Sequence, residues 1–126
     1  MASNSINEEA ERAIKGLKKL PETDAIIIFG SAAKGKMKPL SDIDIAVIAR
    51  ESTKKAEAEI SSFSSRLLDV VVFQKLPLYI QFEALKNGRP VFIRSRERFA
   101  QAKAEVLRNY LEMSHSYQRM SRMVLA

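Results

Sequence analysis

The sequence predicts an α/β or α+β domain in which a small mixed β-sheet of about four strands is flanked by helices. Two observations predict this class: short continuous apolar runs alternate along the chain with segments whose apolar residues recur at helical spacing. The chain has 126 residues, of which 46% are apolar and 29% charged, as in an ordinary globular domain. We expect a single domain over residues 1–126, with a core over about 6–94 and a helical extension over about 95–126.

The first expected element is an amphipathic helix near the N-terminus. Asn7 is placed to cap it, and Pro21 is expected to stop it because proline cannot continue a helix. The apolar positions that indicate the helix are Ile6, Ala10, Ala13, Ile14 and Leu17.

Four strands are expected to follow. A continuous apolar run over 25–29 predicts a buried strand, and a second strand is expected over 43–49. Residues 69–73 predict the third strand. Residues 90–93 predict a short fourth strand at a sheet edge, because Pro90 cannot donate to the hydrogen-bond ladder.

Three further helices separate or follow these strands. One is expected to begin at Ser52 or Thr53 and to run to about Leu68, and another to begin at Pro77 and end at Gly88. From Ser95 the pattern is helical almost to the C-terminus.

Two acidic residues mark the beginning of the second strand. Asp42 and Asp44 are two positions apart, so both carboxylates are expected on one face of the strand, while Ile43 and Ile45 point to the core. Adjacent like charges repel, and a divalent cation such as Mg²⁺ or Mn²⁺ removes that conflict. Taken alone, an Asp-x-Asp pair is also typical of a solvated strand end.

A glycine–serine pair ends the first strand, ten residues before Asp42. Gly30 lets the backbone approach an oxyanion closely, and Ser31 adds a hydroxyl donor. Lys34 and Lys36 follow in the loop, where they are placed either to reach nucleotide phosphates or to remain solvated.

Asp69 is the third acid and opens an apolar strand. A turn residue is one explanation. The alternative is that Asp69 acts together with Asp42 and Asp44, either as a further metal ligand or as a base for an attacking hydroxyl. Two metal ions held by three carboxylates stabilise both the entering and the leaving oxygen of an in-line displacement.

The segment from Gly30 to Asp44 resembles the signature of the DNA polymerase β-like nucleotidyltransferase superfamily. The resemblance covers about residues 10–95, with Asp69 at the expected third-acid position, and the chain's size resembles the minimal nucleotidyltransferase (MNT) branch. The resemblance implies that Asp42, Asp44 and Asp69 bind two Mg²⁺ ions. It also implies that Gly30 and Ser31 hold the triphosphate of ATP.

Members of this size resemble the antitoxins of MNT–HEPN toxin–antitoxin pairs, which transfer AMP to a tyrosine of a helical HEPN ribonuclease. The expected function is therefore transfer of a nucleoside monophosphate to a hydroxyl of such a partner. Two alternatives stay open: a non-catalytic antitoxin that acts by contact, and a transferase acting on a small molecule such as an aminoglycoside. The latter class usually carries additional acceptor-binding structure.

The C-terminal helix carries an apolar seam with heptad-like spacing. The seam favours a partner or self-association, and packing against the chain's own sheet is the alternative. Its positions are Val106, Tyr110, Met113, Tyr117, Met120 and Val124. His115 on the same helix falls in a segment that matches the HEPN ribonuclease motif. We interpret this match as coincidence, because a HEPN domain needs a whole helical bundle.

The formal charge of +6 indicates either solubility or attraction for a polyanion. Lysines cluster over 34–38 and arginines over 89–98. No aromatic residues are interleaved with these clusters, as they would be in a surface that binds single strands, so we do not expect the protein to require nucleic acid as a partner. The chain has no cysteine, which agrees with a cytoplasmic location. No signal peptide and no membrane span are expected.

Overall fold

A computed structural model of the chain describes residues 2–30 and 43–125. It contains a four-stranded mixed sheet in the order β3-β2-β1-β4. Strand β1 (Thr23–Phe29) pairs antiparallel with β2 (Ile43–Ala49) and with β4 (Arg89–Ile93). Strand β3 (Leu68–Val72) runs parallel to β2. The predicted fold class is therefore confirmed, including the edge position of the strand that contains Pro90.

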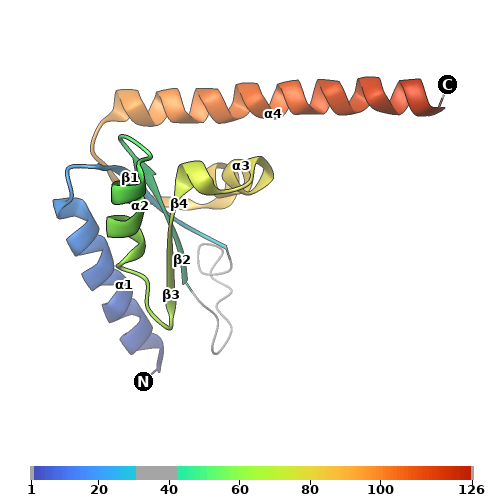
Figure 1. Cartoon of the computed structure of the whole chain (residues 1–126). Coiled ribbons are helices and arrows are strands. Elements are labelled where there is room, and N and C mark those ends of the chain that lie inside the picture. Colours follow the sequence, from blue (N-terminus) through green and yellow to red (C-terminus); the bar gives the residue numbers. More distant parts are fainter. Residues whose placement is uncertain (1, 31–42, 126) are drawn as a thin grey trace.

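The helices form a layer on each face of the sheet (Figure 1). Helices α1 (Ala2–Lys19) and α2 (Lys54–Ser61) cover one face, where Leu17 and Ile60 pack on strand residues such as Ile45. Helices α3 (Leu78–Asn87) and α4 (Arg96–Leu125) cover the other face. A 3-10 turn, η1 (Phe73–Lys75), connects β3 to the segment before α3. Within the described ranges, no helix is both long and apolar enough to cross a membrane.

Two predicted helix boundaries are wrong. Helix α1 begins at Ala2, so Asn7 lies inside the helix and does not cap it. Helix α2 begins as predicted, with the Thr53 side chain accepting a hydrogen bond from the Ala56 N–H, but ends at Ser61. The chain leaves the helix there because Phe63 packs against the core from a turn, a tertiary contact that sequence periodicity does not reveal.

The apolar seam of α4 is divided by its surroundings. Phe99 and Val106 are buried against the sheet, and Tyr110 stacks on Phe82 of α3 with ring centroids 4.1 Å apart. Beyond Tyr110 the helix extends past the rest of the molecule (Figure 1), and Met120 and Val124 are 65% and 80% exposed. Packing on the chain's own body thus accounts for the first two seam positions, Val106 and Tyr110.

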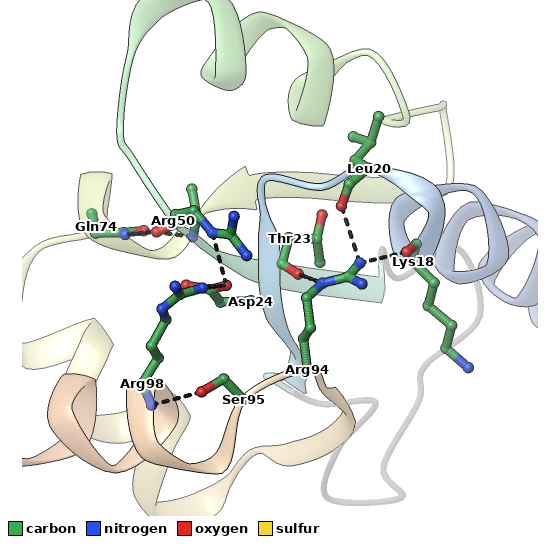
Figure 2. A network of polar contacts seen from close by, with 10 residues as sticks. Lys18, Leu20, Thr23, Asp24, Arg50, Gln74, Arg94, Ser95 and Arg98 are labelled. Carbon is green, nitrogen blue, oxygen red and sulfur yellow. Dashed lines mark hydrogen bonds and ion pairs between the residues drawn. The ribbon is translucent and has the colours of Figure 1, made fainter.

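Arg94 joins the end of α1 to the segment between β4 and α4 (Figure 2). Its Nη2 donates to the carbonyls of Lys18 and Leu20 at 2.6 and 3.1 Å, and its Nε donates to the carbonyl of Thr23 at 2.8 Å. These contacts provide donors for carbonyls that the end of a helix leaves without intrahelical partners.

Arg94→Met is expected to lower the free energy of unfolding by about 1.5 kcal/mol, the lower end for charge-assisted hydrogen bonds, because Arg94 is exposed to solvent. Urea denaturation followed by circular dichroism measures the change. Arg89→Met, at the exposed start of β4, serves as the control and should be close to neutral. Equal stability of the two variants would show that the Arg94 contacts contribute nothing.

Candidate active site

Two of the three predicted acids lie side by side in the sheet. Asp44 on β2 and Asp69 on β3 are register partners in the parallel pair, and neighbouring strands lie about 4.8 Å apart. Asp69 is exposed and Asp44 is half-buried. The two carboxylates therefore share one face of the sheet at an accessible position.

The alternation of side chains along β2 decides which face this is. Ile43 and Ile45 belong to the core beneath α1 and α2, whereas Ala46 and Ile48 belong to the core beneath α3 and α4. Asp44 stands between Ile43 and Ile45 in the strand, so its side chain points to the opposite face of the sheet, the one that α3 and α4 cover. The sequence prediction that Ile43 and Ile45 point away from the acid, into the core, is confirmed.

Hydrogen bonds fix the start of β3 next to Asp69. The Ser64 hydroxyl accepts from the Val70 N–H at 2.9 Å and donates to the Val70 carbonyl at 3.1 Å. The Ile43 N–H donates to the Leu67 carbonyl at 3.0 Å. The turn before β3 is thereby tied to β2 and β3 at the level of the acids. Sequence reasoning missed Ser64, because its partner lies across a turn whose geometry is not encoded in spacing.

Gly30 brings the backbone against the Asp44 carboxylate. Its φ is +79°, a conformation that residues with a side chain rarely adopt. A Cβ at this position would lie 2.7 Å from Asp44 Oδ2. Glycine is therefore required here both by the backbone conformation and by the close approach of the acid.

Gly30→Ala is expected to reduce nucleotide transfer by about tenfold or more, because the added methyl displaces the Asp44 carboxylate and a misplacement of about 1 Å can be that costly. Transfer of radiolabel from ATP measures the loss. Thermal melting separates it from the backbone strain, which costs about 1–2 kcal/mol. Unchanged transfer would show that the position of the Asp44 carboxylate is not critical.

Asp42, Ser31, Lys34 and Lys36 lie outside the described residues, so their predicted roles stay predictions. Within the described ranges, no three His, Cys, Asp or Glu side chains gather as a metal site. The donor chemistry nevertheless fits a hard cation, because Asp44 and Asp69 place carboxylate oxygens on adjacent strands and such cations prefer carboxylate oxygens as ligands.

His115 is exposed on the projecting part of α4. It lies more than 40 residues along the chain from Asp69, and no hydrogen bond or ion pair of its side chain is found among the described residues.

The sequence profile of the polymerase β nucleotidyltransferase family matches residues 11–97, and the chain belongs to that family.

Individual relatives point to the same fold. The chain is 34% identical over 67 residues to a candidate protein adenylyltransferase of Methanocaldococcus jannaschii, and it spans about half the length of that relative, 53% of each protein being matched. A chain of a toxin–antitoxin complex with AMP-PNP superposes with a TM-score of 0.69 at 20% identity, over 92% of this chain and 98% of that one. A chain of the complex between a tri-AMPylated Shewanella oneidensis HEPN toxin and its MNT antitoxin superposes with a TM-score of 0.65 at 18% identity, over the whole of both chains.

Proposed function

We propose that this protein transfers AMP from ATP to a hydroxyl group of a partner protein, as an antitoxin of the MNT–HEPN type. The observation that carries the proposal is the pairing of Asp44 with Asp69 on adjacent strands beside the positive-φ Gly30. Family membership supports the nucleotidyl transfer. The choice of AMP and of a protein acceptor is supported by the names of the relatives, which include a candidate protein adenylyltransferase and an AMPylated toxin bound to its antitoxin.

In the proposed reaction the acceptor oxygen attacks the α-phosphorus of ATP. A bond forms between that oxygen and the phosphorus, the bond from the phosphorus to the bridging oxygen breaks, and pyrophosphate leaves. Asp69, the exposed acid, accepts the hydroxyl proton and orients the acceptor.

Asp44, together with Asp42 as the resemblance implies, would hold Mg²⁺ or Mn²⁺ against the triphosphate. The ions, when bound, neutralise charge on the phosphates and on the leaving pyrophosphate. Gly30 keeps the backbone close to Asp44, and the resemblance assigns Ser31, Lys34 and Lys36 to phosphate binding.

Incubation with ATP, magnesium and a co-purified helical partner tests the proposal. Label at the α-phosphate should become covalently attached to the partner, whereas label at the γ-phosphate should leave with pyrophosphate. Chelation of divalent metal should stop the transfer. Transfer of the γ-label, or no α-label on any purified partner, would contradict the proposed reaction.

A second function is favoured by the projecting half of α4, which exposes Met113, Met120 and Val124. An exposed apolar helix face is typical of an interaction surface, so an antitoxin acting by contact alone remains an alternative. Truncation after Tyr110 is the appropriate variant, because Val106 and Tyr110 support the chain's own core. Under the contact hypothesis, the truncated protein loses neutralisation while an Asp44→Asn variant keeps it; under the transfer hypothesis, Asp44→Asn loses it.

A further inference from the structure

A hollow of about 420 Å³ lies at the opposite end of the sheet from Asp44. Gly30 follows the end of β1 and Asp44 lies at the start of β2, whereas the hollow lies where β1 begins and β2 ends. We call it the arginine pocket, because three arginines are among its lining residues. Its lining residues are Arg50, Arg94, Ser95, Glu97, Arg98 and Gln101.

A buried carboxylate organises two of these arginines. Asp24 is 3% exposed, and its Oδ1 lies 3.2 Å from Arg98 Nη1 and 3.8 Å from Arg50 Nε. Figure 2 shows both side chains converging on Asp24 from different elements, Arg50 from the end of β2 and Arg98 from the first turns of α4. Because Asp24 is buried at the start of β1, its carboxylate draws both guanidinium groups to this end of the sheet.

Each guanidinium group keeps unused donors. In the described part of the chain, the hydrogen bonds of Arg94 use Nε and Nη2 and leave Nη1 without a protein acceptor. The contacts with Asp24 likewise leave Nη2 of Arg98 and both terminal nitrogens of Arg50. The side chains of Arg50 and Arg98 are 44% and 46% exposed, so a ligand in solvent can reach these donors.

The charge of the pocket favours an anion. Three arginines face two carboxylates, Asp24 and Glu97, which leaves a positive excess. The positive end of the α4 dipole adds to this excess. Among the described residues that line the hollow there is no aromatic ring, so they offer no surface on which a nucleobase would stack. Guanidinium groups bind phosphate oxygens through paired N–H donors, which makes phosphate the matching chemistry.

We propose that the arginine pocket is a second anion site, which binds a phosphate group and is independent of the acid site. The proposal refines the arginine cluster seen in the sequence: Arg94 and Arg98 contribute to the pocket, Arg50 joins them from a distant part of the chain, and Arg89 does not line it. The phosphate has two chemical sources, a small phosphate compound such as pyrophosphate or the backbone of a polynucleotide.

Binding measurements on the full-length protein in EDTA test the proposal, because excess chelator removes divalent metal from the acid site. Pyrophosphate is titrated by calorimetry, and a labelled single-stranded RNA of random sequence by fluorescence anisotropy. Arg50→Gln is expected to weaken binding by about tenfold or more, in keeping with the loss of a charge-assisted hydrogen bond. Arg96→Gln removes the same charge from an exposed position of α4 that does not line the pocket, and should change affinity by less than about twofold.

A second variant does not touch the contacts with Asp24. Gln101→Glu adds a carboxylate to the lining and should reduce binding at least as much as Arg50→Gln. Binding of pyrophosphate alone identifies a small ligand, and binding of RNA alone identifies a polynucleotide. The proposal is overturned if neither probe binds at millimolar concentration, or if Arg96→Gln weakens binding as much as Arg50→Gln does.

Discussion

Replacement of Asp44 by asparagine is expected to reduce the rate of nucleotide transfer by at least about a thousandfold. This is the upper end of the loss that follows when an enzyme loses one group that stabilises charge in the transition state. Asp44 is the central acid of the site: it lies between Phe29 of β1 and Asp69 of β3 in the sheet register, with Gly30 close by. Asparagine keeps the size of the side chain but removes the charge that would hold a divalent cation. Initial rates of α-label transfer, measured at saturating magnesium, give the comparison.

The fold should survive this substitution, because Asp44 is only half-buried and asparagine relieves its repulsion with Asp69. The melting temperature should therefore stay within a few degrees of the unmodified protein. Glu51→Gln is the matched control, since it removes one carboxylate from an exposed turn at the far end of β2. Transfer that persists in Asp44→Asn at the rate of Glu51→Gln would refute the assignment of the acid site.

Gly88→Ala is expected to lower the free energy of unfolding by about 3 kcal/mol, the upper end of the usual cost of inserting a methyl into a packed region. Gly88 is the C-cap of α3, and its N–H donates to the Ala84 carbonyl at 2.8 Å. A Cβ would collide with that carbonyl and would lie 3.0 Å from the Ile28 carbonyl and 2.8 Å from Ile27 Cγ2. Two of these three atoms are backbone atoms of α3 and β1, so neither can move aside cheaply.

Gly16→Ala provides a matched comparison for this prediction. Its added Cβ would meet the ring of Phe63, a half-buried side chain, whereas the Cβ at Gly88 would meet two backbone carbonyls. Alanine also gains about 0.5–1 kcal/mol over glycine inside a helix. Urea denaturation should therefore show Gly16→Ala clearly less destabilised than Gly88→Ala, because a side chain yields more readily than a backbone carbonyl. Equal effects would mean that backbone crowding at Gly88 has been overestimated.

The elements were predictable where local pattern and packing agree. The apolar run at 25–29 became the central strand β1, buried on both faces, and Thr53 capped α2 as its position in the sequence predicted. Pro90 lies in the edge strand β4, where a missing N–H does least harm. The end of α2 at Ser61 was not predictable, because the tertiary packing of Phe63 rather than helix propensity decides it.

The polar network around Asp24, at the end of the sheet far from Asp44, could not be predicted from the sequence either. Asp24 precedes an apolar run and gives only the weak indication that a charge there needs a partner. Its partners Arg50 and Arg98 lie 26 and 74 residues further along the chain. Arg94 belongs to the arginine cluster identified over 89–98 in the sequence, and its guanidinium binds carbonyls at the end of α1.

The sequence by itself determined the alternation of helices and strands, and the candidate acids with their position at strand ends. It could do so because the period of side chains along a strand or helix is a local property of the backbone. Only the tertiary structure decided that Asp44 and Asp69 are register partners, since the pairing of β2 with β3 joins segments separated by α2. It also decided that Gly30 lies against Asp44 and that α4 packs through only part of its apolar seam, because such contacts arise from long-range packing.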